Sequence, residues 1–124
     1  MPDQQQLDIL KQGANAWNVW RKEHPEIEPD LNETDLSNID LSGANLSRVN
    51  LSGTNLTGAI LSKADISWSN LVGADLSRAN LSEANLSDAD THGALFRGAN
   101  LKGAIITPEQ INQAQSPDSL PEPS

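Results

Sequence analysis

A large apolar residue recurs at every fifth position from Leu31 to Ile106, with Thr91 as the one exception, and this repeat constrains the fold more than any other feature. Sixteen such positions, which we call centres, follow one another without an insertion. The residue two before a centre is small, with Ala at ten of the fifteen positions from Thr34 to Ala104. Asn or Asp precedes the centre in twelve of fifteen cases and Ser or Thr follows it in eleven of fifteen, so the consensus is Ala-(Asn/Asp)-Leu-Ser-x.

A period of five fits neither an α-helix nor a flat strand. A helix turns about 100° per residue, so a step of five moves the centre about 140° and no apolar stripe forms. Side chains of a strand alternate between two faces, so centres five apart would point to opposite faces. The small residue and the centre can both point inward if the chain turns by roughly a right angle every five residues. Four repeats then close one square coil.

Stacked square coils predict an all-β solenoid of about four coils, each about 4.8 Å from the next. Each centre then lies over the centre twenty residues later, so Leu41, Leu61 and Leu81 share one interior column. Ala beside each centre keeps this thin interior from being overpacked. The outward Asn, Asp, Ser and Gly have turn chemistry, and we interpret columns such as Asn50 and Asn70 as structural ladders.

Two long runs, LSGANLSRVNLSGTNLTGAILSKADIS and LVGADLSRANLSEANLSDAD, resemble the pentapeptide-repeat family. The resemblance covers about two thirds of the chain. It implies a right-handed quadrilateral β-helix, and the handedness comes from the resemblance alone. The segment LDILKQGANAWNVWRKEHPEIEPDL is similar to the N-terminal caps of many cyanobacterial members, which implies a bacterial cytoplasm.

The two ends of a solenoid expose apolar interior and unpaired edges, so helical caps are expected there. Apolar residues at helical spacing predict an amphipathic helix over residues 4–23 with Asp3 as N-cap, and Gly13 inside it predicts a bend or close packing. Thr107, Pro108 and Gln110 form a helix start with a capping box. The expected organisation is an N-terminal capping helix and linker at 1–29, the solenoid at 30–107, a short C-terminal capping helix at 108–115 and a disordered tail at 116–124.

Composition and charge exclude several classes of function. The chain has no Cys, which excludes disulfides, thiolate zinc sites and a Cys nucleophile. Eight Lys and Arg against 17 Asp and Glu give a net charge of −9, which argues against direct binding of nucleic acid. No apolar run is long enough to span a membrane and no secretory signal is recognisable, so we expect a cytoplasmic protein with no membrane partner.

No residue pattern indicates catalysis, a cofactor or a metal. His24 and His92 each lack a second ligand at a metal-binding spacing. The outward carboxylates lie on a wet, convex surface that gives them no reason for a strongly shifted pKa. The glycines between 43 and 103 all occupy one turn position of the repeat and do not form a phosphate loop.

Four outward residues depart from the consensus and form the candidate partner-binding patch: Arg48, Trp68, Val72 and His92. Arg48 and Trp68 are twenty residues apart, so we expect them in one column with Asp88, with the guanidinium able to lie on the indole face. Val72 stacks beneath His92 in the next column. An exposed Trp is typical of an interface anchor. The alternative is that Trp68 covers a turn or packs against the capping helix.

These observations predict a non-enzymatic, monomeric scaffold that binds a protein partner of unassigned identity, without a cofactor. The family resemblance implies an alternative, because some members imitate duplex DNA and bind topoisomerases such as gyrase. The charge weighs against it, since residues 30–107 carry nine acidic and five basic groups, a net charge of only −4. Duplex DNA carries one charge per about 1.7 Å. The gyrase-protecting members also favour Phe at the centres, where this chain has Phe96 alone.

Overall fold

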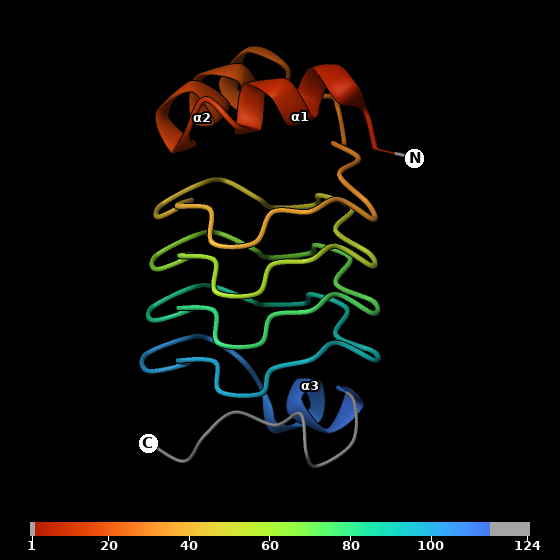
Figure 1. The fold of residues 1–124 in the computed structure, drawn as a ribbon, viewed down its shortest axis with the longest axis vertical. Helices are drawn as coiled ribbons and strands as arrows, with labels where there is room; N and C mark the ends of the chain where they lie inside the picture. Colours follow the sequence, from red (N-terminus) through yellow and green to blue (C-terminus); the bar gives the residue numbers. More distant parts are fainter. Residues whose placement is uncertain (1, 115–124) are drawn as a thin grey trace.

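The computed structural model describes residues 2–114, which form a tower of stacked coils with helices at both ends (Figure 1). Helices α1 (Gln4–Leu10) and α2 (Ala14–Glu23) lie together at one end, and α3 (Pro108–Gln113) lies at the other. The prediction of a disordered tail at 116–124 falls outside the described residues. The sequence therefore places its helices at the two termini and its repeats between them.

The coils stack with a period of twenty residues. Parallel bridges join residues twenty apart, from the pair Asp30 and Asn50 to the pair Asn85 and Ile105. Within residues 2–114 each bridge is an isolated residue pair, and none is extended into a strand of several residues. Each side of the coil therefore contributes a single bridge residue. The reason is the repeat itself, because the two residues after each centre form a turn and leave one bridge residue in every five.

Every backbone N–H of a typical repeat has an acceptor, as the repeat 75–79 shows. Two of its five N–H groups bond within the repeat and three bond to neighbouring coils. The bonds run from Asp75 N to Thr54 O (3.0 Å), Leu76 N to Leu95 O (2.7 Å), Ser77 N to Asp75 Oδ1 (3.0 Å), Arg78 N to Arg97 O (2.8 Å) and Ala79 N to Leu76 O (3.0 Å). An unpaired buried amide would cost free energy. Because every amide of the repeat is paired, the coil avoids this cost, although its interior is narrow.

The outward Asn and Asp residues serve the turns of their own coil. Asn50 Oδ1 accepts from Ser52 N at 3.0 Å, and Asn70 Oδ1 accepts from Val72 N at 3.0 Å. These residues share a column, as predicted, but the recorded bonds of their Oδ1 atoms lie within one coil. Each of these side chains therefore supports a turn of its own coil, and the stabilising side-chain ladder stays a prediction.

The interior consists of the predicted centres and their small neighbours. Leu41, Leu61 and Leu81 are fully buried, which confirms the inward orientation on which the square coil depends. Thr91 is also buried at a centre, and its hydroxyl donates to Gln110 O at 2.7 Å, so this polar exception ties α3 to the last coil. Ser69 takes the place of the consensus Ala, and its buried Oγ has no hydrogen-bond partner.

The N-terminal segment forms two helices, so the prediction of one continuous helix over residues 4–23 is wrong. Gly13, with φ of 112°, ends the first helical path and begins α2. Asp3 caps α1 as predicted, its side chain accepting from Gln6 N at 3.1 Å. Glycine is the residue that adopts such a φ without strain, which turns the expected bend into a break.

Side chains of α2 bond to the outer edge of the first coil. Trp17, which is fully buried, donates from Nε1 to Asn45 O at 2.7 Å. Asn18 accepts from Asn45 N at 2.7 Å and donates to Gly43 O at 3.1 Å, so its amide takes the place of a neighbouring strand. The part of this edge from Gly43 to Asn45 is therefore paired rather than open to another chain.

Helix α3 begins with the predicted capping box. Thr107 accepts from Gln110 N at 3.1 Å, and Gln110 Oε1 accepts from Thr107 N at 2.9 Å. The Gln110 amide also donates to Leu86 O at 2.6 Å and Ala89 O at 3.1 Å. The cap residue thus joins the helix to backbone of the solenoid, and the helix ends at Gln113 rather than at 115.

Candidate binding surface

The residue two positions after each centre from Leu31 to Leu101 lies at a corner of the coil and has a positive φ, from 52° at Glu33 to 75° at Gly103. In the turns that begin at Leu36 and later centres, the centre carbonyl accepts from the amide three residues later, as Leu71 O does from Ala74 N at 2.9 Å. A positive φ at this place is the mark of a type II turn, which favours Gly. These corner residues stack twenty apart into four corner columns.

One corner column contains no glycine. The other three carry Gly at 53, 73 and 93, at 58 and 98, and at 43 and 103. The fourth consists of Arg48, Trp68 and Asp88, and we call it the Trp68 column. A bulky residue at positive φ is uncommon and costs about 1 kcal/mol or more in backbone strain. At this corner the chain has large side chains in place of the residue that suits the backbone.

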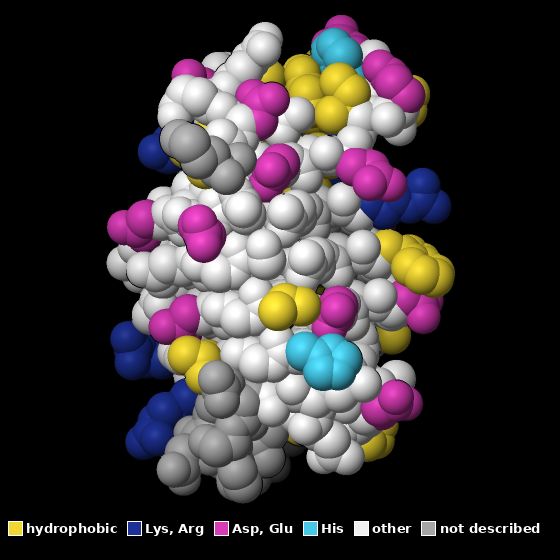
Figure 2. Space-filling model, turned by 90° about the vertical axis from the view of Figure 1, so that its right-hand side faces the viewer, with side chains coloured by type: hydrophobic (Ala, Val, Ile, Leu, Met, Phe, Trp, Pro, Cys, Tyr) yellow, Lys and Arg dark blue, Asp and Glu magenta, His cyan; other side chains and the backbone are white. Residues whose placement is uncertain are grey.

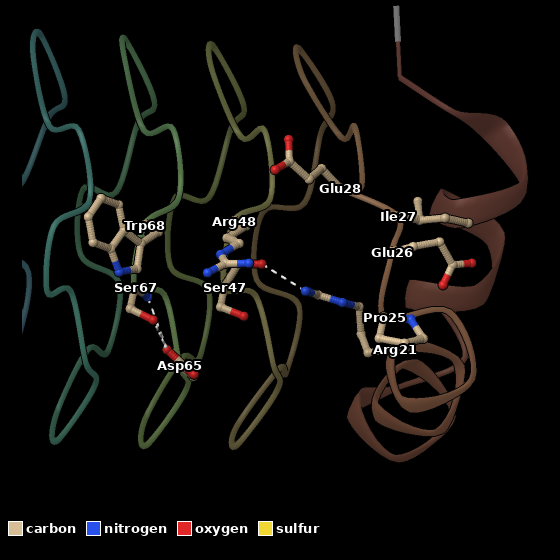
Figure 3. A pocket seen from close by; sticks show the side chains of 10 residues that line it. All are labelled: Arg21, Pro25, Glu26, Ile27, Glu28, Ser47, Arg48, Asp65, Ser67 and Trp68. Atoms are coloured by element: carbon tan, nitrogen blue, oxygen red, sulfur yellow. Dashed lines mark hydrogen bonds between the residues drawn. The ribbon is translucent and has the colours of Figure 1, made fainter.

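A hollow of about 390 Å³ lies beside the Trp68 column, between the coil and the chain that leads out of α2. Figure 3 shows the linker side chains on one side of it and those of the coil on the other. The lining residues are Arg21, linker residues 25–28, Ser47, Arg48, Asp65, Ser67 and Trp68. A second hollow, lined by Glu28, Arg48, Val49, Asn50, Trp68 and Asn70, adjoins the same two corner side chains.

Arg21 fixes the wall of the first hollow. Its Nη1 donates to Asn45 O at 2.9 Å. Its Nη2 donates to Ser47 O at 2.9 Å (Figure 3). Burial lowers the pKa of the Arg21 guanidinium, while the negative charge of Asp65 opposes that shift. Arginine stays protonated in proteins, so Arg21 is a cation held in place by two of its five N–H donors.

The structure brings together two of the four predicted patch residues. Arg48 and Trp68 line the same two hollows, and the Trp68 side chain is 61% exposed, so it does not lie beneath the capping helices. Val72 and His92 lie in the neighbouring column and line neither hollow. The four-residue patch as a whole therefore stays a prediction.

His92 pairs with the carboxylate that precedes it in its own turn. Its Nδ1 lies 2.6 Å from Asp90 Oδ1, and both side chains are more than half exposed. The hydrogen bond from the imidazole, together with one from the His92 backbone N–H, lowers the pKa of Asp90. His24 lies at the C-terminus of α2, where its ring stacks on Trp20 at a centroid distance of 5.0 Å. Both histidines thus have local partners.

Three acidic residues of the hollow were missed by the sequence reasoning: Glu26, Glu28 and Asp65. Glu28 could have been found from the period, since it lies twenty residues before Arg48 and Asn50 N bonds to Pro29 O at 2.9 Å. Glu26 lies in a linker outside the repeat, so no spacing rule could place it. Asp65 occupies the same position of the repeat as the other consensus Asp residues, so the sequence does not set it apart. Its place beside the hollow is seen only in the structure.

The described residues contain no cluster of three or more His, Cys, Asp or Glu positioned to hold a metal ion. Within residues 2–114, none of the helices has the length and apolar character that crossing a bilayer requires.

Residues 30–62, 59–98 and 74–107 match the family model described as pentapeptide repeats. No curated protein sequence matches the chain. Among solved structures, the chain is similar to the pentapeptide repeat protein Rfr23 from the cyanobacterium Cyanothece 51142, with 30% identity and a TM-score of 0.62 over 78% of this chain and 67% of that one. It also resembles alr5209, a pentapeptide repeat protein from Nostoc Pcc 7120, with 30% identity and a TM-score of 0.49 over 74% of each chain.

A third similar structure is QnrB1, a plasmid-mediated fluoroquinolone resistance protein. Its identity to this chain is 23% and the TM-score is 0.58, over 62% of this chain and 40% of QnrB1. At that identity the likeness concerns the fold alone.

Proposed function

The chain belongs to the pentapeptide-repeat family, whose fold is the right-handed β-helix, and from this premise we propose that it is a non-enzymatic scaffold that binds another protein. In this proposal about four coils, closed by helices at both ends, hold one corner rigid for a partner. The chain acts as a monomer in the cytoplasm. Rigid presentation favours binding because little conformational freedom is lost on association.

The observation that carries the proposal is the exposed indole of Trp68 at a corner of positive φ. The side chain is 61% exposed and φ is 61°, whereas Gly73 holds the next corner of the same coil at φ of 68°. Strained residues that the surrounding structure maintains are concentrated at functional sites. Trp is among the residues that most often anchor protein interfaces. The Trp68 column is therefore the surface where we place the partner.

Imitation of duplex DNA by this chain is the weaker candidate, because acidic and basic side chains are mixed along the tower. Lys63 and Glu83 share one corner column, while Arg78 belongs to another. On the face shown in Figure 2 the acidic side chains lie scattered among uncharged ones, without a continuous band. A rod that replaces DNA would need a dense acidic face.

The experiment is affinity capture from a native lysate with the wild-type chain and Trp68→Gly, followed by quantitative mass spectrometry. Gly suits the corner backbone, so the variant removes the indole without destabilising the coil. Arg78→Gly is the matched control, since Arg78 also lies at a corner, with φ of 59°. We expect a captured protein whose yield falls with Trp68→Gly and is unchanged with Arg78→Gly. Equal yields from all three chains would refute the proposed interface.

A further inference from the structure

Carboxylates outnumber cations around the Trp68 column. Glu26, Glu28 and Asp65 line the hollow beside it. Asp88 follows Trp68 in the column, because Trp68 N donates to Ser87 O at 2.9 Å and so places Asp88 one coil away. The cations here are Arg21 and Arg48. The local balance is therefore four negative groups against two positive groups.

Of the two cations, Arg48 is the more accessible to a ligand. The Arg21 guanidinium donates to two backbone carbonyls and is partly buried, as described above. Arg48 is exposed, and within residues 2–114 neither Arg48 nor Glu28 forms an ion pair. An incoming group thus meets several carboxylates, of which Asp65 interacts electrostatically with Arg21, together with the exposed guanidinium of Arg48.

Along its column, the indole of Trp68 has a positively charged neighbour on one side and a negatively charged neighbour on the other. Arg48 precedes it, and Asp88 follows it toward the C-terminal end of the tower. Coils lie about 4.8 Å apart, so a group resting on the indole can also reach the carboxylate of the next coil. A cation is attracted by both the ring face and Asp88, whereas an anion is repelled by Asp88 and gains nothing from the ring face.

We infer that the Trp68 column receives a basic segment of the partner protein, which places a Lys or Arg side chain against the indole between Asp65 and Asp88. This inference rests on the proposed function and adds the chemistry of the partner. The whole chain, with its net charge of −9, attracts a basic segment over a longer range and so speeds the encounter. An acidic segment would have Arg48 alone to pair with and would meet the four carboxylates.

The test uses the full-length ¹⁵N-labelled chain at about 0.15 M salt, where distant charges are largely screened. The probes are tetralysine and tetraglutamate peptides with blocked ends. The chain has three Trp residues, and the indole N–H signal of Trp68 is assigned by its absence in Trp68→Phe. We expect tetralysine to shift that signal saturably and tetraglutamate to leave it in place. The signal of Trp17, whose indole N–H donates to Asn45 O, should not move.

Two double variants locate the binding charge. Asp65→Asn with Asp88→Asn keeps the turn acceptor at 65 and a residue tolerant of positive φ at 88, so the fold is preserved. Glu33→Gln with Glu83→Gln removes the same charge from two other corner columns and is the control. We expect the first pair to weaken tetralysine binding roughly fivefold, the combined effect of exposed ion pairs and ring contact. The control should weaken it less than about twofold.

Three results would overturn the inference: a larger shift with tetraglutamate, no shift with tetralysine, or equal weakening by both double variants. Failure of the inference differs from failure of the proposed function. If capture from lysate depends on Trp68 while tetralysine leaves its signal unmoved, the interface stands and the basic partner is wrong. If capture is independent of Trp68, the interface itself is wrong.

Discussion

Two neighbouring corners of one coil, residues 66–69 and 71–74, share the same backbone and differ in what they display. Both turns have a buried centre, Ile66 and Leu71, and both have a positive φ at the corner residue. The second corner carries Gly73, which suits that φ, and the first carries Trp68. The difference shows that the repeat determines the backbone at every corner but leaves the corner side chain free to vary. Among the corners that depart from Gly, Trp68 carries an exposed aromatic side chain, and we propose the binding surface there.

The largest expected effect on stability comes from the buried centres beneath the two corners. Ile66→Ala and Leu71→Ala each remove a side chain that is at most 1% exposed, so each should lower the free energy of unfolding by about 2–5 kcal/mol. Chemical denaturation monitored by circular dichroism measures both. Similar losses would show that the two corners rest on one interior. A loss of stability confined to Leu71→Ala would mean that the side chain of Ile66, beneath the Trp68 corner, does not contribute to the same interior.

The next effect concerns the turn acceptors. Asp65 Oδ1 accepts from Ser67 N at 3.0 Å and from Ser67 Oγ at 2.6 Å, whereas Asn70 Oδ1 accepts from Val72 N at 3.0 Å. Asp65→Ala should cost about 1–3 kcal/mol and Asn70→Ala about 1 kcal/mol, because the charged acceptor supports two donors. Equal losses in denaturation would contradict the assigned difference between the two turns.

Exchanging the corner residues should have opposite effects on stability. Gly73→Ala should cost about 1 kcal/mol through backbone strain alone, since a Cβ there meets no atom within 4 Å. Trp68→Gly should gain about 0.5 kcal/mol, because relief of strain exceeds the added freedom of Gly in the unfolded chain. Thermal unfolding of both variants measures the pair. A destabilised Trp68→Gly variant would show that the indole supports the fold, which is the alternative that Trp68 covers a turn or packs against the capping helix.

A smaller effect is expected behind the Trp68 corner. Ser69 takes the inward place that Ala74 takes at the next corner, and its buried hydroxyl has no partner. Ser69→Ala should raise the free energy of unfolding by about 1 kcal/mol or less, because it removes an unsatisfied polar group and leaves the packing unchanged. The reverse change, Ala74→Ser, is the control and should destabilise the chain in the same denaturation assay.

The smallest effect is the pH dependence of the exposed Asp90–His92 pair, one coil beyond Val72. The pKa of Asp90 is lowered by the His92 side chain and backbone, so its contribution to stability is present above the unfolded pKa and lost as pH falls through the folded one. His92→Ala should raise the pKa of Asp90 toward its ordinary value in an NMR titration. Asp40, whose pKa is lowered by Ser42, should not change. An unchanged Asp90 would assign the shift to the backbone bond alone.

Much of the fold could be predicted because the repeat leaves few ways to bury its centres. The inward centres, the capping box of Thr107 and the N-cap of Asp3 all follow from local patterns, and the structure confirms them. The sequence predicted a bend at Gly13 and not a break, because the helical spacing of apolar residues continues past this residue. The φ of Gly13, 112°, depends on how the two helices pack in the folded chain. The inward place of Thr91 follows from the period, but its bond to α3 was beyond a spacing argument.

The candidate surface was predicted in part. The pairing of Arg48 with Trp68 follows from the twenty-residue period, because stacked positions share a column. The hollow does not, since it depends on how residues 25–28 leave α2 and pass over the coil. Linkers obey no period, so the places of Glu26 and of the fixed Arg21 could come only from the assembled structure.

The sequence by itself determined the coil, its interior and the columns, because a five-residue pattern leaves one geometry in which all its apolar residues are buried. The tertiary structure alone decided how the terminal helices close the edge, which carboxylates surround the Trp68 column and which cation is already engaged. Periodic positions are set by short-range rules that repeat along the chain. Contacts between a helix, a linker and a coil depend on the path of the chain in space, which no repeat specifies.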